Sequence, residues 1–137
     1  TYPKCKLLPE SIAGEVRVLG IMNYAVHTLH TQGFARIFTT ERFSPSSSDH
    51  ESVKAQGRQI IDQGFAIINR ELEGRDYVAD QFSIADAALF YVEFWADRTG
   101  IPLPANCAAH YRLMLTRPAV RQVLAEEGYA SVLRQTS

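Results

Sequence analysis

The sequence has little of what marks several protein classes. It contains two cysteines in 137 residues, Cys5 and Cys107, without a Cys-x-x-Cys pair or zinc-site Cys/His spacing, which favours reduced thiols and predicts no metal site. The formal net charge is −1 and Lys and Arg are not clustered, so no nucleic-acid or anionic-membrane partner is predicted. No apolar run approaches the roughly 20 residues of a membrane span, and no signal-peptide pattern is present.

Strand patterns and catalytic motifs are also missing. No stretch alternates apolar and polar residues with the period of two that is typical of a β-strand, and no internal repeat is visible. The serines lie at helix starts or in the loop at 46–48 without a nucleophile-elbow motif, and there is no glycine-rich phosphate loop. The pair Glu126 and Glu127 is typical of a solvated helix end. We therefore assign no catalytic residue to this chain.

The residues that are present predict an all-α fold. With 46% hydrophobic and 21% charged residues, the chain has the composition of one soluble domain. One long amphipathic helix is expected over about 13–38, with its core face made by Val16, Leu19, Met22, Val26, Leu29 and Ile37. A capping box of Ser48 and Glu51 predicts a second, antiparallel helix that ends at Gly74. Pro104 and Pro118 each open a later helix, and the last one stops at Gly128.

A second capping box marks the start of the central helix. Ser83 and Asp86 stand three residues apart before a long apolar run, so each can satisfy the backbone N–H of the other. Residues 87–96 are apolar on almost every side, and such a helix belongs in the middle of a bundle. Ser83 and Asp86 are therefore predicted to form a buried, structural cap.

The segment around this box resembles one in the C-terminal helical domain of glutathione transferases. That family has an aromatic residue, an apolar pair, Ala or Gly, Asp, and then Phe-Ser/Thr-Ile-Ala-Asp, while residues 77–86 read Tyr-Val-Ala-Asp-Gln-Phe-Ser-Ile-Ala-Asp. The resemblance covers nearly the whole chain. It extends to a linker-like stretch with Pro3 and Leu7-Leu8-Pro9, to a first helix like that of the bacterial beta class with Asn23-Tyr24 and Leu29-His30, and to closing helices at 109–114, 117–120 and 125–128.

The resemblance implies a glutathione transferase C-terminal-like bundle of about five or six helices over residues 13–137, after an interdomain linker over residues 1–12. It implies a cytoplasmic, bacterial homodimer that conjugates its co-substrate glutathione to small hydrophobic electrophiles in detoxification. In that family an upstream thioredoxin-like domain holds the thiol-activating residue, and the helical domain supplies the electrophile pocket and part of the dimer contact. We therefore expect such a domain before Thr1, and expect the chain alone to be inactive.

Matching positions in the family suggest three ligand-binding residues. His30 resembles a beta-class histidine that points toward glutathione and can donate a hydrogen bond or positive charge to its thiolate. That class usually has Lys after this histidine and Glu two residues before it, where this chain has Thr31 and Thr28. Asn23 resembles a position that reaches glutathione across the dimer interface, and Trp95 resembles one that lines the electrophile pocket. Packing in the core is the alternative for Asn23 and Trp95.

A mostly polar line on the first helix adds two further candidates. Asn23, His27, His30 and Phe34 follow one another at steps of three and four. This line either faces a ligand, with His27 and Phe34 against the electrophile, or is a solvated or interface face with incidental histidines. A metal shared by the two histidines would need a third ligand, and none is near in sequence.

Two other functions stay open at this point. A relative with this fold can lack catalysis and serve as a binding or assembly module, because a fold does not determine function. A pure scaffold has no need of His30, so the polar line argues for a ligand. Alternatively, the chain is an independent helical ligand-binding protein with a polar, self-contained surface. The residues that precede Thr1 would discriminate among these possibilities.

Overall fold

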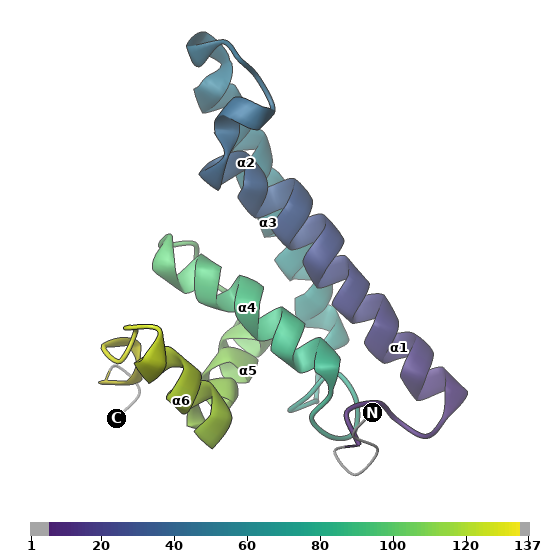
Figure 1. Ribbon diagram of the computed structural model, residues 1–137. Coiled ribbons are helices and arrows are strands. Elements are labelled where there is room, and N and C mark those ends of the chain that lie inside the picture. Colours follow the sequence, from purple (N-terminus) through teal and green to yellow (C-terminus); the bar gives the residue numbers. More distant parts are fainter. Residues whose placement is uncertain (1–5, 135–137) are drawn as a thin grey trace.

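The computed structural model describes residues 6–134, and every regular element within them is helical (Figure 1). This confirms the predicted all-α fold class. Pro3 and Cys5 lie outside the described residues. The elements are α1 (Ile12–Asn23), η2 (Tyr24–Phe34), α2 (Ala35–Phe38), η3 (Thr40–Arg42), η4 (Ser47–Asp49), α3 (His50–Glu71), α4 (Ile84–Arg98), α5 (Ala105–Thr116), α6 (Pro118–Glu126) and η5 (Val132–Arg134).

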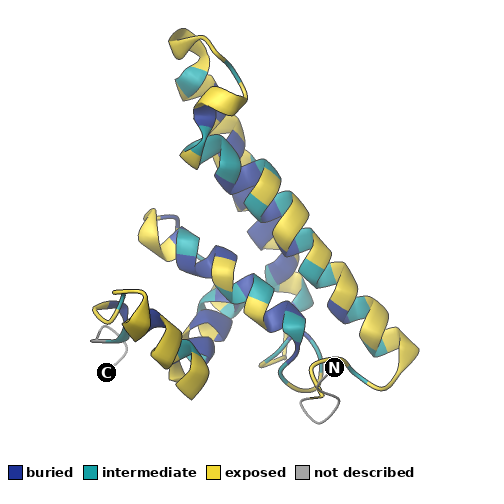
Figure 2. Ribbon diagram, in the orientation of Figure 1, coloured by how far each residue is buried: buried dark blue, intermediate teal, exposed yellow. Residues whose placement is uncertain are grey.

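Two long helices form the frame of the domain. Figure 1 shows α1, η2 and α2 as one continuous rod that runs antiparallel to α3, as the sequence predicted. The central helix α4 packs on α1 and η2 and also on α5, which in turn contacts α3 and α6. In Figure 2 the buried residues lie where these elements face one another, and α4 carries many of them. The functional candidates on η2 and α4 are thus held by two packed helices.

The core face of the first helix differs from the predicted one. Val16, Leu19 and Val26, expected in the core, are exposed by 64%, 40% and 48%. Leu29 is fully buried as predicted, and Met22 and Ile37 are partly buried against the core. The other fully buried apolar residues of this rod are Val18, Ala25 and Phe34, which were not predicted to be there. Two lines of the helix are apolar, and packing on α3 and α4 selects one of them. Residues 24–34 also form a π-helix, whose wider turn buries Phe34 five residues after Leu29.

Glycine allows the first helix and α3 to approach closely. A methyl group added at Gly57 of α3 would lie 2.8 Å from the carbonyl oxygen of Gly33 in η2. A methyl group at Gly33 would lie 2.6 Å from Cγ1 of Ile61. Both distances are too short for real contacts, so a larger residue at either position would push the helices apart. Gly33 therefore marks a close contact between η2 and α3.

The start of α3 is not the predicted capping box. A 3₁₀ turn, η4, precedes the helix, and Asp49 occupies the N-cap position without a capping hydrogen bond from its side chain. The Ser48 hydroxyl donates to Asp49 instead, and Glu51 pairs with Lys54. The prediction was wrong because neighbouring serines and acids offer Ser48 a local partner that competes with the helix N-terminus.

The other helix boundaries agree with the local signals. Ser83 and Asp86 form the predicted capping box at the start of α4, and both residues are buried. Pro118 is the first residue of α6. Gly74, Gly100 and Gly128 all have positive φ, which favours glycine after a helix. These signals require only a few adjacent residues, which is why they were readable.

Candidate functional site

The outer side of α4 carries aromatic residues that face the first helix. Tyr91 and Trp95 stand one turn apart, with ring centroids 5.9 Å from each other. The His30 ring from η2 lies edge-on to Tyr91 at 5.3 Å, and the Phe38 ring from α2 lies 4.9 Å from Trp95. We call these four residues, together with Phe34, the aromatic face. It brings together three of the predicted ligand residues: His30, Phe34 and Trp95.

Only part of the aromatic face is available to a ligand. Tyr91 and Phe38 are exposed by 44% and 45%, whereas His30 is half-buried. Phe34 is fully buried and stacks beneath Phe38 with ring centroids 5.9 Å apart. Phe34, which the sequence suggested as a direct electrophile contact, therefore supports Phe38 from below. Tyr91 and Phe38, the two rings that reach the surface, were not identified from the sequence.

Trp95 joins the aromatic face to the core. Its half-buried ring packs against both hydrophobic clusters of the domain and lies T-shaped to Phe94 at 5.8 Å. Its Nε1 is buried, yet no hydrogen-bond acceptor for it is found within residues 6–134. The alternative of a core tryptophan with an internally satisfied N–H is thus not what the structure shows. Trp95 is a packing residue with one edge on the aromatic face.

Asn23 and His27 lie apart from the aromatic face. Both are exposed, and in the described chain neither side chain has a hydrogen bond, ion pair or ring contact. The residues of the predicted polar line therefore differ in their surroundings: Asn23 and His27 are exposed, His30 is half-buried and Phe34 is fully buried. Within residues 6–134, no side-chain hydrogen bond or ring contact joins Asn23 or His27 to the aromatic face.

The opposite side of α4 holds a buried cluster of three ionisable residues, Asp86, Glu93 and His110. The His110 ring, from α5, lies with Nδ1 2.8 Å from Glu93 Oε2 and with Nε2 3.1 Å from Asp86 Oδ1. Asp86 also accepts the backbone N–H groups of Val78 at 2.8 Å and Ser83 at 2.7 Å, and the Ser83 hydroxyl at 2.8 Å. The cluster thus ties α5 to the capping box and to the loop before α4.

The charge of each group in this cluster follows from the balance between its burial and the number of hydrogen bonds that it makes. Burial favours neutral Asp86, but the bonds from His110, Val78 and Ser83 outweigh it and lower the Asp86 pKa. Burial also disfavours the imidazolium, yet its bonds to Asp86 and Glu93 raise the His110 pKa to about 9. For Glu93 burial wins, and it raises the pKa of this carboxyl to about 7. Asp86 and His110 therefore form the ion pair, with Glu93 beside it.

Sequence reasoning missed Glu93 and His110 as members of a site. Glu93 stands in the middle of an apolar helix, seven residues after Asp86, and seven residues are close to two helical turns. That spacing is a signal that two carboxylates share one buried face. Buried carboxylates need a donor, and His110 lies in the mostly apolar segment Ala108–Leu113. Their pairing across two helices is not readable from local sequence.

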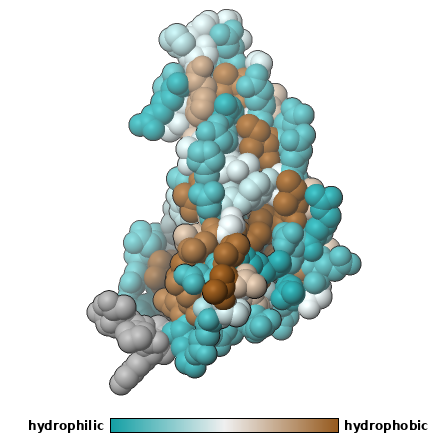
Figure 3. Space-filling model, turned by 90° about the vertical axis from the view of Figure 1, so that its right-hand side faces the viewer, coloured by the Kyte–Doolittle hydropathy of each residue, from teal (hydrophilic) through white to brown (hydrophobic). Residues whose placement is uncertain are grey.

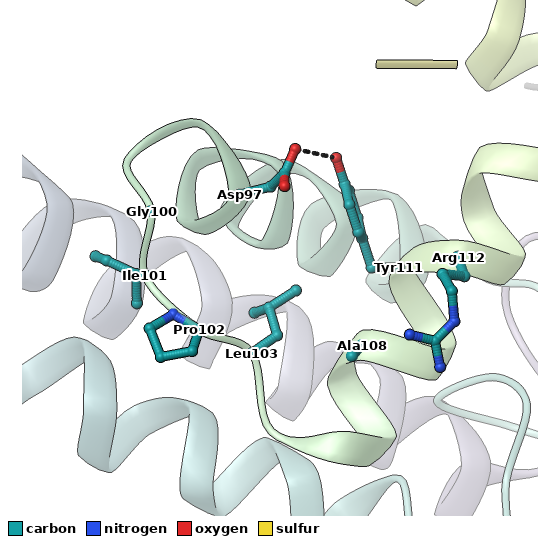
Figure 4. Close-up of a pocket in the computed structure, with 8 residues that line it drawn as sticks. All are labelled: Asp97, Gly100, Ile101, Pro102, Leu103, Ala108, Tyr111 and Arg112. Carbon is teal, nitrogen blue, oxygen red and sulfur yellow. Dashed lines mark hydrogen bonds between the residues drawn. The ribbon is translucent and has the colours of Figure 1, made fainter. Parts of the chain in front are cut away.

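A pocket at the other end of α4 contains none of the predicted ligand residues (Figure 4). It lies between the end of α4, the loop through Ile101 and Pro102, and α5. The Tyr111 hydroxyl donates to Asp97 Oδ2 at 3.1 Å, so these two groups satisfy one another. Nothing in the lining therefore points to a bound ligand.

A family profile described as "Glutathione S-transferase, C-terminal domain" matches residues 51–126, which is more than half of the chain. The chain belongs to the glutathione S-transferase family. The matched residues contain α4, α5, α6 and all of α3 except its first residue, and thus the buried cluster and two of the five residues of the aromatic face. The resemblance inferred from the capping segment is confirmed. No curated protein sequence matches the chain.

Solved glutathione transferase structures share the fold. A glutathione S-transferase from Xylella fastidiosa superposes with a TM-score of 0.81 at 19% identity, covering 92% of this chain and 63% of that one. A glutathione transferase homolog from Sulfitobacter, solved with bound glutathione, superposes with a TM-score of 0.80 at 23% identity, covering 93% of this chain and 62% of that one. The present chain thus spans less than two thirds of either structure. No helix within residues 6–134 has the length and apolar character needed to span a membrane.

Proposed function

We propose that this chain is the electrophile-binding half of a glutathione transferase of the bacterial beta class, which conjugates glutathione to small hydrophobic electrophiles. The observation that carries this proposal is the aromatic face, where Tyr91 and Phe38 present half-exposed rings beside His30. Aromatic rings bind flat apolar molecules by stacking and by burial of apolar area. Detoxification in the cytoplasm is the role that we infer for such an activity.

His30 is the residue proposed to contact glutathione. Its ring is held edge-on to Tyr91, and within the described residues its nitrogens have no hydrogen-bond partner. A fixed, half-buried imidazole with free nitrogens can donate a hydrogen bond to a thiolate. Bound glutathione in the Sulfitobacter homolog supports glutathione as the co-substrate. Asn23 and His27 are exposed and unpaired, and we propose Asn23 as a contact to glutathione of a partner subunit and His27 as a contact to electrophile.

Activity measurements test this function. The 137-residue chain alone should not accelerate conjugation of glutathione to an aromatic chloride, because thiol activation is assigned to a thioredoxin-like domain upstream. The chain preceded by the upstream residues of its own gene should be active, and His30→Ala in that longer protein should lower activity or weaken glutathione binding. The half-buried His50 supplies a matched control: its Nε2 lies 3.1 Å from the carbonyl oxygen of Ser44 and it is not part of the aromatic face, so His50→Ala should leave activity unchanged.

Two results would contradict the proposal. Turnover by the chain alone would show that the thiol is activated within these residues. A longer protein that binds glutathione without conjugating any of several electrophiles would favour the non-catalytic binding or assembly module instead.

We further propose that the protein is a homodimer through the outward line of α1 and η2. Ile12, Val16, Leu19 and Val26 are exposed apolar residues at helical steps. Figure 3, which views the molecule from the α1 side, shows apolar patches spread along this face. Sedimentation over a wide concentration range should show a dimer, and Val16→Lys should shift it toward monomer, with Glu15→Lys beside it as the control. A monomer at every concentration would contradict this assembly.

A further inference from the structure

Glu93 occupies a position that suits a neutral carboxyl better than a charged one. The residue is fully buried in the middle of α4. Its Oε2 lies 2.8 Å from His110 Nδ1, while its Oε1 has no hydrogen-bond partner within residues 6–134. An ionised carboxylate out of contact with water needs several donors, and here it has one. The geometry therefore penalises a negative charge at Glu93.

Among the described residues, the cation that contacts Glu93 is His110, and Asp86 already balances it. That carboxylate accepts bonds from Val78, Ser83 and His110, which makes it the fixed negative partner of the imidazolium. With Asp86 and His110 charged and Glu93 protonated, the cluster has a net charge of zero. Ionisation of Glu93 leaves a net charge of −1 inside the core, without a second cation to compensate it.

No other group facing Glu93 supplies that compensation. From α5, the Cys107 and Tyr111 side chains both have raised pKa values and are neutral. Burial is the main cause for both; Glu93 comes next for Cys107, whereas for Tyr111 Asp97 precedes the smaller effect of Glu93. The Cys107 thiol is directed to the carbonyl of Phe65 in α3. In the part of the chain that is described, no side chain of α1, η2 or α3 forms an ion pair with Glu93.

We propose that Glu93 is a proton-operated switch in the contact between α4 and α5, binding a proton when the domain folds and destabilising that contact when the proton leaves near neutral pH. The raised Glu93 pKa, about 7 against an ordinary 4.5, agrees with this geometry and gives the pH window. Between these values the unfolded chain has lost the proton and the folded domain still holds it. Stability from this group is therefore fully present below pH 4.5 and is lost as the pH rises to about 7.

Urea unfolding of the 137-residue chain as a function of pH tests the switch. A difference of one bound proton changes the folding constant by up to about tenfold per pH unit. The wild-type constant should therefore fall, relative to that of Glu93→Gln, as the pH rises from 4.5 to 7. The variant keeps an acceptor for His110 and cannot ionise. Glu73→Gln, at an exposed position beyond α3, is the matched control and should follow the wild type.

A parallel pH dependence of wild type and Glu93→Gln across this window would overturn the proposal. If Glu93→Gln does not fold, the proposal is tested on the wild type alone, by measuring the titration of Glu93 directly. The side-chain carboxyl carbon of Glu93, followed by NMR in a chain labelled at glutamate, should titrate near pH 7. Titration near the ordinary value of 4.5 would refute the switch, because the folded domain would then hold the charge without cost.

Discussion

The two sides of α4 carry different kinds of residue: aromatic rings on the outer side and ionisable groups on the inner side. The outer side presents Tyr91 and Trp95 to the first helix and partly to solvent, in contact with the rings of His30 and Phe38. The inner side holds Asp86 and Glu93 against His110, out of contact with water. At about 3.6 residues per turn, Tyr91 and Trp95 lie nearly opposite Asp86 and Glu93. One apolar-looking helix thus separates an aromatic surface from a buried polar network.

This difference assigns two roles to one helix: the inner residues stabilise the fold, and the outer residues are the ones proposed to contact a ligand. Truncating a partly exposed aromatic side chain should lower the free energy of unfolding only slightly, because part of its surface is already in water in the folded protein. Buried charges depend on one another, and removing one leaves the rest without compensation. Changes on the inner side should therefore act on folding, and changes on the outer side should act on binding.

The largest effect is expected from Asp86→Ala. This change removes the acceptor for Val78, Ser83 and His110 at once and leaves a buried imidazolium without its main partner. Breaking a buried ion pair on one side costs about 3–5 kcal/mol. Urea unfolding near pH 7 should show a loss of this size. Asp80→Ala, in the exposed loop before α4, is the control and should change stability by about 0.5 kcal/mol or less. Equal losses of unfolding free energy for the two variants would mean that the buried cluster contributes no more to stability than an exposed carboxylate does.

A smaller effect should appear in alkaline solution through His110. Its pKa is raised from 6.5 to about 9 in the folded domain, so its stabilising charge is fully present below pH 6.5 and is lost as the pH rises to about 9. Thermal unfolding should therefore occur at a lower temperature at pH 9 than at pH 6.5. A higher midpoint at pH 9 would show that the imidazole is neutral in the core and that the bonding pattern described here is wrong.

The smallest effect on stability is expected from Tyr91→Ala on the outer side. Because the ring is 44% exposed, the variant should lose about 1 kcal/mol or less. Trp95 is the single tryptophan of the chain and touches Tyr91, so its fluorescence reports on the aromatic face. An aromatic apolar probe should change this fluorescence less in Tyr91→Ala than in the wild type. An unchanged response would place the probe elsewhere.

Local signals predicted the parts of this structure that depend on adjacent residues. The capping box of Ser83 and Asp86 formed because its partners are three residues apart. The box of Ser48 and Glu51 did not form, since Asp49 and Lys54 offered competing partners within the same few residues. A local capping pattern thus predicts the structure reliably where no other residue within a few positions offers its side chains an alternative hydrogen-bond or ion-pair partner.

The candidate site was predicted only in part. His30 and Trp95 do lie on one surface, but Phe34 is beneath it, and Tyr91 and Phe38 were not identified. The sequence placed His30 and Phe34 on a line drawn at regular helical steps, whereas residues 24–34 form a π-helix with a wider turn. A periodicity read along the chain does not detect such a change of helix type.

The sequence by itself determined the all-helical fold, most helix ends and the buried cap, because caps, glycine stops and proline starts act over three or four residues. Only the tertiary structure decided which apolar residues of the first helix enter the core, because Val16, Leu19 and Val26 are as apolar as the buried Val18 and Leu29. It also decided the charge of Glu93. That charge depends on His110, seventeen residues away, and on the absence of water around both, conditions that exist only when α4 and α5 have packed.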